Sequence, residues 1–339
     1  MAKQKSTITI AVAAICLVVL ILDSKTAFTG AYDGLQFCLQ VVIPSLFPYY
    51  LISITLVSLL SCKKGAILRP FGKVLRIPKG AEIIYILGLL GGYPVGAQSI
   101  VSAYKQGMIN KRNAERMLAF CNNAGPAFIF GFGSTLFIHP CNCWVVWFIH
   151  VISSVLVATI TPAEPLSIAS SFKCNTYSLT DAFQQALRTM ASVCGWVILF
   201  RTTTAILERW LFCITAPDIE MFISGLLELS YGSSQLRAYS SEIQKMTYFT
   251  TLLSFGGFCV AMQTYTVFSS ANLSFQYYFP GKFLQAAISY LICIMLFSHD
   301  TQNFYGIFSL FSFGLVCIIY LRYYNKNKNT SRNIHRNSI

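Results

Sequence analysis

Charged residues are scarce in this sequence. They make up 11% of its 339 residues, whereas hydrophobic residues make up 55%, and the mean hydropathy is +0.59. A soluble protein of this length needs more charged residues to cover its surface. Soluble classes are therefore excluded, and the composition predicts an all-α polytopic membrane protein. The net charge of +13 does not indicate nucleic-acid binding, because the cations gather in short loops between apolar runs, as on the cytoplasmic side of membrane proteins.

The sequence also lacks the short motifs of common catalytic and nucleotide-binding sites. There is no HExxH, no GxSxG and no GxxxxGK[ST], and the 12 cysteines include no CxxC pair. We therefore expect no enzyme activity, no catalytic residue, no cofactor and no metal site. Among the four histidines, His150 falls within an apolar run, where a neutral imidazole bonded to a neighbouring helix is favoured over a proton relay.

What the sequence does contain is a glycine-rich stretch inside an apolar run. Residues 88–98 read GLLGGYPVGAQ and lie in the middle of residues 81–104. Glycine and proline disfavour a continuous helix, and a broken helix is tolerated in a bilayer only where protein or a water-filled cavity covers the break. Basic residues flank both ends of the run, which predicts a hairpin that enters and leaves on the cytoplasmic side. A glycine-rich helix packed closely on a neighbour is the alternative.

The other apolar runs and the loop charges between them predict about eight transmembrane helices and a second re-entrant hairpin, at residues 221–236. Both termini are then cytoplasmic, because this arrangement places most of the cations on that side. The crossings are expected at residues 7–22, 35–61, 127–138, 144–161, 182–207, 248–271, 283–297 and 303–321.

The chain divides into two similar halves around a polar linker. Each half has a broken or polar span, a hairpin, a span with a central break and a plain span, and Gly88-Leu-Leu recurs as Gly225-Leu-Leu. The halves are of opposite orientation, which predicts an inverted repeat with a substrate site between the repeats. The predicted units are an N-terminal transmembrane helix (1–34), the first repeat (35–161), a cytoplasmic linker (162–180), the second, inverted repeat (181–298), and the last transmembrane helix with a basic cytoplasmic tail (299–339).

Four motifs follow one another through the two halves. They are Gly91-Gly-Tyr-Pro-Val-Gly-Ala97, Phe120-Cys-Asn-Asn-Ala-Gly-Pro126, Gly225-Leu-Leu-Glu228, and Ser254-Phe-Gly-Gly257 with Gln263. In these motifs and their order, residues 35–298 resemble the YlbJ-type sporulation integral membrane proteins. That family belongs to the nucleoside-recognition or Gate-domain group, which is related to the concentrative nucleoside transporters.

The resemblance implies two Gate-like repeats and a transporter that moves a small organic anion, dipicolinate, toward the forespore. The protein would lie in the bacterial inner membrane or in the membrane around the forespore. Alternatives are a nucleoside-type or other small-molecule transporter of the Gate group, or a sporulation membrane scaffold or gating subunit that transports nothing. Expected partners are membrane lipid, a small anionic or nucleoside-like substrate, and Na⁺ or H⁺; a second copy of the chain or another sporulation membrane protein is also open.

The helix breaks and the polar residues beside them form the predicted substrate site, because unwound backbone and amides hydrogen-bond a cargo without adding charge. We expect backbone N–H groups at two half-helix starts, near Pro94 and after Gly232, to hold the anion. The predicted substrate-binding residues are Gly91, Gly92, Tyr93, Pro94, Gly96, Gln98, Asn122, Asn123, Gly125, Ser254, Gly256, Gly257 and Gln263.

Two charged residues inside apolar runs are predicted to serve coupling or gating. Ionised side chains are costly within a membrane, so Glu228 and Arg201 need a function or a partner. We expect Glu228 to bind a proton or Na⁺, and the alternative is a fixed ion pair with Arg201 or Arg188. Arg201 is either a counter-charge for an anionic substrate or a residue that snorkels to the interface beside Glu208.

Overall fold

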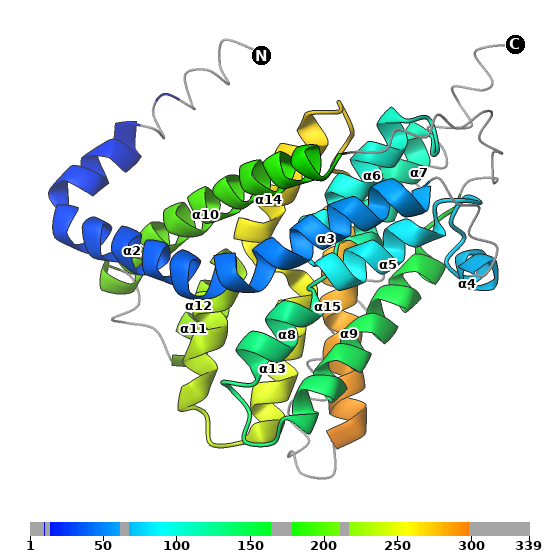
Figure 1. Ribbon diagram of the computed structural model, residues 1–339. Helices are drawn as coiled ribbons and strands as arrows, with labels where there is room; N and C mark the ends of the chain where they lie inside the picture. Colours follow the sequence, from blue (N-terminus) through cyan, green and yellow to red (C-terminus); the bar gives the residue numbers. More distant parts are fainter. Residues whose placement is uncertain (1–9, 11–13, 62–67, 164–177, 211–216, 298–339) are drawn as a thin grey trace, which may run out of the picture.

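The structure is a computed structural model that describes residue 10 and residues 14–61, 68–163, 178–210 and 217–297, and no strand occurs in these ranges. Figure 1 shows the helices as one bundle in which long and short helices cross at different angles. The first half comprises α2 (Ser24–Phe37), α3 (Ile43–Ser61), α4 (Arg69–Val74), α5 (Glu82–Gly91), α6 (Val95–Lys105), α7 (Lys111–Cys121), α8 (Pro126–Gly133) and α9 (Cys141–Ile160). The second half comprises α10 (Leu179–Trp210), α11 (Pro217–Leu227), α12 (Leu229–Gln235), α13 (Glu242–Phe255), α14 (Gly257–Ser269) and α15 (Tyr278–Phe297).

The helices confirm a helical membrane protein but do not support the predicted count of eight crossings. Within the described residues, four helices are long and apolar enough to cross a membrane, or five if one bent pair near the N-terminus is counted as a span. The expected crossing at 127–138 is instead the short helix α8. The run at 303–321 and part of the run at 7–22 lie outside the described residues. The four helices are Cys141–Ile160, Leu179–Trp210, Glu242–Ser269 and Tyr278–Phe297.

The two halves repeat one order of elements. In each half a long helix, α3 or α10, is followed by two short helices that fold back on each other, α5–α6 or α11–α12. An interrupted helix comes next, α7–α8 or α13–α14, and a helix of 20 residues, α9 or α15, closes the half.

The N-terminal region differs from the prediction. The residues between the first two predicted spans form α2 rather than a loop, and the helix Ser24–Val42 is bent by 98° from Ala14–Leu22. A π-helical turn at Cys38–Val42 then joins α2 to α3. Pro44 follows this turn, and because proline has no N–H to bond to the carbonyl of residue 40, the helix widens there.

Helix α2 exists because it has a packing partner far along the chain. It lies beside α10 in Figure 1. A Cβ atom added to Gly30 would lie 2.8 Å from Cβ of Ala205, and one added to Gly34 would lie 2.9 Å from Cα of Ile198. Small residues at these positions let the two backbones approach closely, as in other membrane helix pairs.

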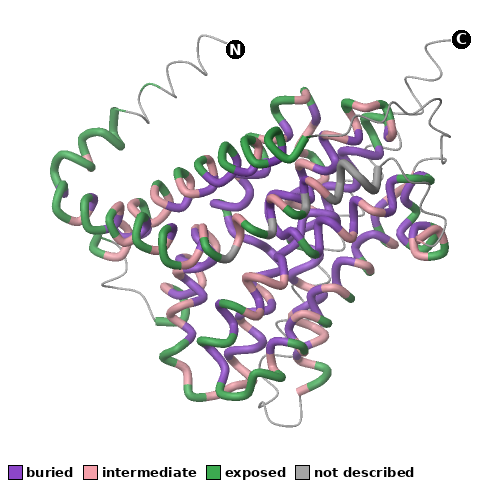
Figure 2. Tube along the Cα trace, in the orientation of Figure 1, coloured by how far each residue is buried: buried purple, intermediate pink, exposed green. Residues whose placement is uncertain are grey.

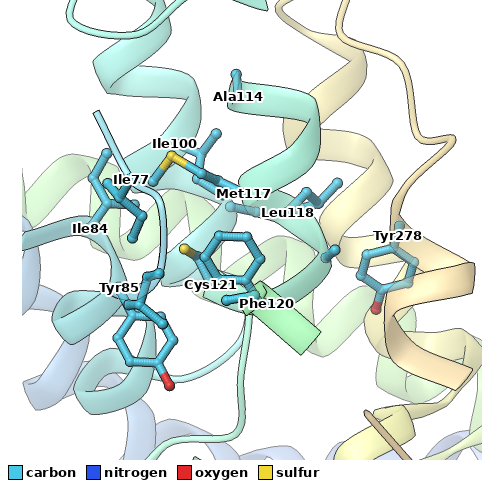
Figure 3. Packing of buried hydrophobic residues seen from close by; sticks show 14 of the residues in the cluster. Ile77, Ile84, Tyr85, Ile100, Ala114, Met117, Leu118, Phe120, Cys121 and Tyr278 are labelled. Atoms are coloured by element: carbon cyan, nitrogen blue, oxygen red, sulfur yellow. The ribbon is translucent and has the colours of Figure 1, made fainter. Parts of the chain in front are cut away.

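Buried residues gather where the short helices meet the long ones, and the outer faces of α2 and α10 stay exposed (Figure 2). Figure 3 shows this core, in which Tyr85, Phe120, Met117 and Cys121 fill the space between α5, α6 and α7. The hydroxyl of Tyr85 lies 2.5 Å from that of Ser154, so the ring is fixed against α9. The short helices therefore have a rigid apolar support.

Arg116 is a basic residue of the first half whose position differs from the one that the loop charges predicted. The sequence placed it among exposed cytoplasmic cations, but its side chain is buried, with 2% of its surface exposed. Its guanidinium donates to four backbone carbonyls at helix ends, those of Leu75, Arg76, Ala158 and Thr161, over 2.8–3.3 Å. A guanidinium has five donors, so it satisfies carbonyls that a helix C-terminus leaves unpaired. Arg116 thus fixes α7 against α4 and α9.

Candidate functional site

The first helix break separates α5 from α6 at Gly92, Tyr93 and Pro94, where the sequence predicted it. Gly92 has φ of 74° and ψ of −172°, a conformation that is open essentially only to glycine. The two short helices fold back on each other and pack closely: a Cβ atom added to Gly88 would lie 3.3 Å from Cα of Gly96. The helix is broken where the sequence predicted, and the close packing of the alternative is present as well, since Gly88 and Gly96 both lie against the carbonyl of Cys121.

The second break, between α7 and α8, is held by its two asparagines. The Asn122 side chain accepts from the Ala97 N–H over 3.3 Å and donates to Oγ1 of Thr264 over 2.9 Å. Asn123 donates to the carbonyl of Phe120 over 2.6 Å and accepts from Nε2 of Gln285 over 3.1 Å. The paired amides therefore satisfy unwound backbone and join three helices, and both side chains are fully buried.

The third break, between α11 and α12, is at Glu228 itself. Its carboxylate accepts from the backbone N–H groups of Ser230 and Tyr231, over 3.1 and 2.6 Å, and so caps α12. The sequence predicted a half-helix start after Gly232, and this is wrong. Gly232 lies inside α12, where its lack of a side chain lets α12 pack directly on the backbone of Gly225. The carboxylate fixes the break four residues earlier.

The fourth break lies between α13 and α14, at Gly256 and Gly257, which have φ of 86° and 79°. A Cβ on Gly257 would lie 3.2 Å from the carbonyl oxygen of Gly225, so this break touches the second hairpin. The first hairpin reaches it as well, because the Tyr93 hydroxyl donates to the carbonyl of Leu253 over 2.7 Å. All four breaks thus lie in contact at the centre of the bundle.

A cavity opens where the breaks meet. It has an empty volume of about 580 Å³, part of it open to the outside. The first three breaks contribute to its wall, together with η1 (Cys38–Val42), α3, α10 and the first turns of α14, which begins at the fourth break. The lining residues are Val41, Val42, Leu46, Gly92, Tyr93, Ala124, Gly125, Phe128, Val193, Val197, Glu228, Leu229, Ser230, Cys259, Val260 and Gln263. The wall is largely apolar, and Glu228, Ser230 and Gln263 are its polar side chains, which is the pattern of a small-molecule site.

The predicted site residues divide into two groups. Gly92, Tyr93, Gly125, Gln263 and Glu228 line the cavity. The others do not line it and hold the breaks from behind: Gly91, Pro94, Gly96, Gln98, Asn122, Asn123, Ser254, Gly256 and Gly257.

Gln98 and Ser254 show how residues outside the cavity wall connect the helices around the breaks. Gln98 donates to Oγ1 of Thr189 over 2.6 Å, which ties α6 to α10. Ser254 lies 3.1 Å from Nδ1 of His150 and 2.7 Å from the hydroxyl of Ser289.

His150 has the structural role that the sequence favoured. Its Nε2 accepts from the backbone N–H of Ala124 over 3.2 Å, so this nitrogen carries no proton. In a neutral ring the proton is then on Nδ1, which donates to Ser254. The imidazole therefore connects the second and fourth breaks.

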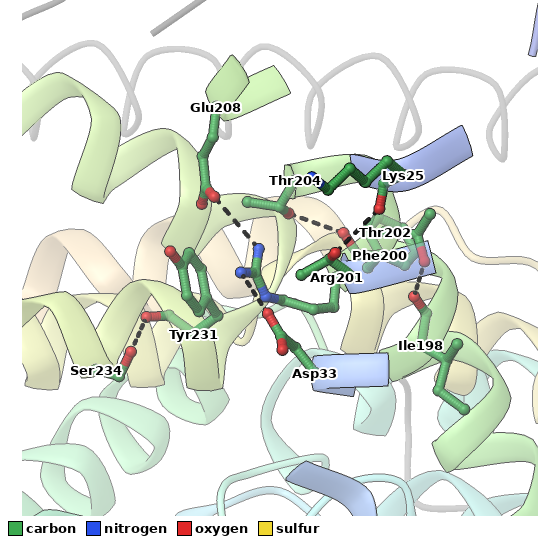
Figure 4. Close-up of polar contacts among 11 residues, drawn as sticks. Lys25, Asp33, Ile198, Phe200, Arg201, Thr202, Thr204, Glu208, Tyr231 and Ser234 are labelled. Carbon is green, nitrogen blue, oxygen red and sulfur yellow. Dashed lines mark hydrogen bonds and ion pairs between the residues drawn. The ribbon is translucent and has the colours of Figure 1, made fainter. Parts of the chain in front are cut away.

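Arg201 lies beside the third break but forms no ion pair with Glu228. Its guanidinium pairs with Asp33 at 3.3 Å and Glu208 at 3.4 Å, and it lies 3.7 Å above the ring of Tyr231 (Figure 4). The alternative in which Arg201 and Glu228 form a fixed pair is therefore wrong. With two acids and a ring around it, Arg201 connects α10 to α2 and α12 rather than facing the cavity.

Lys282 is a central residue that the sequence missed. The predicted crossing began at residue 283, but α15 begins at Tyr278, so this lysine lies within the helix. Its side chain is fully buried, its Nζ donates to Oε1 of Gln285 over 2.9 Å, and it lies 5.4 Å from the centre of the Tyr93 ring. One signal was available in the sequence, because Gln285 and Ser289 continue a polar stripe from Lys282 at helical spacing.

At the starts of α6 and α12, backbone N–H groups that could bind an anion already donate to side chains of the protein. At α6, Asn122 takes the N–H of Ala97, and at α12 the Glu228 carboxylate takes two N–H groups. Among the described residues, no group of three or more His, Cys, Asp or Glu side chains is placed to hold a metal ion. Glu228 thus gives the cavity wall an acidic side chain, and the buried Lys282 lies beside the wall residue Tyr93.

Comparison with known proteins agrees with the motifs. No protein-family profile matches the chain, and no solved structure matches it significantly. The chain is similar to the sporulation integral membrane protein YlbJ of Bacillus subtilis (strain 168), with 23% identity over 317 aligned positions. The alignment covers 80% of this chain and 78% of the relative, and it supports a YlbJ-type family assignment.

Proposed function

Taking the chain as a YlbJ-type membrane protein, we propose that it transports a small organic anion across the bacterial inner membrane or the membrane around the forespore. The proposed cargo is dipicolinate, moved toward the forespore during sporulation. One observation carries the proposal: three helix breaks from the two halves of the chain line one cavity in a membrane bundle, and the fourth break contacts them from behind. Interrupted helices from two repeats that face one central site are typical of secondary transporters.

The chemistry of the cavity lining suits such a cargo. An aromatic ring would lie against Tyr93, Phe128 and the aliphatic wall, and Ser230 and Gln263 offer polar atoms to its edge. A scaffold has no need to keep costly unwound backbone around an open cavity inside a membrane. We propose that the two halves form an inverted repeat, that both hairpins are re-entrant, and that both termini are cytoplasmic, so that the halves rock about the breaks.

We propose that Glu228 couples transport to a cation. An ionised carboxylate in the cavity wall repels an anionic cargo, so loading is favoured when Glu228 binds H⁺ or Na⁺. The cap on α12 makes this a two-state element, because a protonated Glu228 accepts less strongly from the N–H groups of Ser230 and Tyr231. Binding of the cation would then loosen the start of α12 when the cargo is present.

Uptake by purified protein in liposomes tests the proposal. The panel is dipicolinate, a benzene dicarboxylate and two nucleosides, and we expect uptake of the dicarboxylates above that of protein-free liposomes. Val197→Phe fills the cavity wall on α10 and should block uptake, whereas Leu199→Phe lies two residues further on the same helix, is exposed, and should not. Uptake of nucleosides alone would indicate a nucleoside-type transporter, and no uptake of any compound would favour the scaffold.

A further inference from the structure

Lys282 is a buried cation without a buried counter-charge. None of its surface is exposed, and among the described residues no carboxylate lies within ion-pair distance of its Nζ. Its hydrogen-bond partner in this part of the chain is Oε1 of Gln285, at 2.9 Å, so two of the three ammonium protons have no acceptor there. Burial of a charge is costly unless the charge is paired and fully hydrogen-bonded.

Two other buried cations of the bundle have more partners than Lys282. Arg116 donates to four carbonyls, and Lys245 pairs with Glu242 at 2.9 Å and donates to the carbonyl of Leu136 at 3.4 Å. These two residues have structural roles that explain their charges. The ammonium of Lys282 is paired with no carboxylate of the described residues, so it is a candidate for an interaction with a ligand.

Lys282 lies one layer behind the cavity wall. Tyr93 lines the cavity, and the lysine lies 5.4 Å from its ring centre, where the ring face attracts a cation. Gln285, the partner of Lys282, also donates to Asn123, which precedes the wall residue Ala124. The Tyr93 ring therefore separates the ammonium from the space in which a cargo would lie.

We propose that Lys282 is the positive charge that selects an anionic cargo, and that the ring of Tyr93 covers it until the cargo binds. The inference rests on the proposed function and names the recognition group of that site: a carboxylate of a small aromatic dicarboxylate pairs with the ammonium. Tyr93 is held to α13 by its bond to the carbonyl of Leu253. Relative movement of the first hairpin and the fourth break releases this bond, moves the ring and opens Lys282 to the cavity.

The test compares a dianion with a neutral compound of the same shape. The probes are radiolabelled dipicolinate and pyridine-2,6-dicarboxamide, and equilibrium binding is measured on purified full-length protein and on Lys282→Met. Wild type should bind the dianion more tightly, and Lys282→Met should weaken binding of the dianion by ~10-fold or more, because one partner of a buried charge pair is lost. Binding of the diamide should stay unchanged, so the preference for the dianion disappears.

The matched control is Lys245→Met, which removes a second buried lysine that does not line or adjoin the cavity. It should keep the preference for the dianion. Thermal stability separates recognition from structure. An unpaired buried ammonium costs stability, so Lys282→Met should melt at or above the wild-type temperature, whereas Lys245→Met removes the ion-pair partner of Glu242 and should melt below it. A Lys282→Met protein that melts well below wild type, or cannot be purified, would give Lys282 a structural role and overturn the inference.

The two levels of the proposal fail in different ways. If wild type binds and transports dipicolinate and Lys282→Met does so equally well, the recognition role of Lys282 is overturned while anion transport stands. If wild type neither binds nor transports any dicarboxylate, the proposed function fails and this inference falls with it. If Lys282→Met loses the preference for the dianion while wild type and Lys245→Met keep it, the result supports both anion transport and the recognition role of Lys282.

Discussion

The backbone of Gly92 touches the backbone of Gly125: a Cβ atom on Gly92 would lie 2.9 Å from the Gly125 nitrogen. The first and second breaks therefore meet without side chains between them, and both glycines line the cavity. This contact fixes the distance between the first and the second break. The shape of the cavity depends on it.

Gly92→Ala should destabilise the protein by about 2 kcal/mol or more, because it combines a backbone conformation open only to glycine with a clash against backbone. The control is Gly107→Ala, which has nearly the same φ, 73° against 74°, but no atom within 4 Å of the added Cβ. The loss in melting temperature of purified protein should be clearly larger for Gly92→Ala. Equal losses would mean that the contact with Gly125 contributes nothing.

Arg116→Met should cost roughly 3 kcal/mol or more, since four buried carbonyls lose their donor at once. Lys111→Met, on the same helix but exposed, should leave the melting temperature unchanged, because its contact with Glu115 is 4.0 Å long and solvated. Heating followed by size-exclusion chromatography measures both. A tolerated Arg116→Met would show that water replaces the guanidinium there.

The positions of the breaks could be predicted because glycine, proline and paired asparagine interrupt helices for local reasons. Gly92, Asn122 and Gly256 lie at or directly beside the breaks where the sequence placed them. The third break was misplaced because its determinant is the carboxylate of Glu228, which caps α12, and a cap depends on the fold-back of two helices rather than on propensity.

The buried cations were missed because counting loop charges assigns every flanking cation to water, although the polar stripe of Lys282, Gln285 and Ser289 was a signal for one of them. Arg116 and Lys282 are buried because they lie on the faces of α7 and α15 that pack into the bundle. The same long-range packing made α2 a helix: Gly30 and Gly34 have their partners on α10, more than a hundred residues later. Such contacts leave no local pattern.

The proposed re-entrant hairpin predicts that Lys79 and Lys105 lie on the same side of the membrane. Both are exposed at the two ends of the α5–α6 pair, and the contact of Gly88 with Gly96 shows that the chain turns back between them. In a cysteine-free background, single cysteines at these positions should react with an impermeant maleimide only from the cytoplasmic side. A protein that keeps Cys141 alone is the control and should react only from outside, because this exposed residue begins α9, at the end that the predicted topology places outside. Reaction of the two test positions from opposite sides would contradict the hairpin and the inverted repeat.

Glu228→Gln tests whether the carboxylate couples transport to a cation. The substitution imitates the protonated acid, so a dependence of transport on pH or Na⁺ should disappear while binding of the cargo is retained. The α12 cap should weaken by about 1 kcal/mol, because the amide offers one acceptor oxygen where the carboxylate offered two. Counterflow exchange in liposomes measures the ion dependence, since it needs no net driving force.

The matched control for this loss of charge is Glu115→Gln. Glu115 is as buried as Glu228, and its carboxylate also accepts two hydrogen bonds, from the N–H of Ser274 over 2.8 Å and from Nε2 of Gln276 over 3.3 Å, but it does not line the cavity. Its replacement should cost similar stability and leave the ion dependence intact. Glu228→Gln transport that stays as ion-dependent as wild type would make Glu228 a helix cap and nothing more, because the loss of a cap alone changes stability without removing a titrating or cation-binding group from the cavity wall.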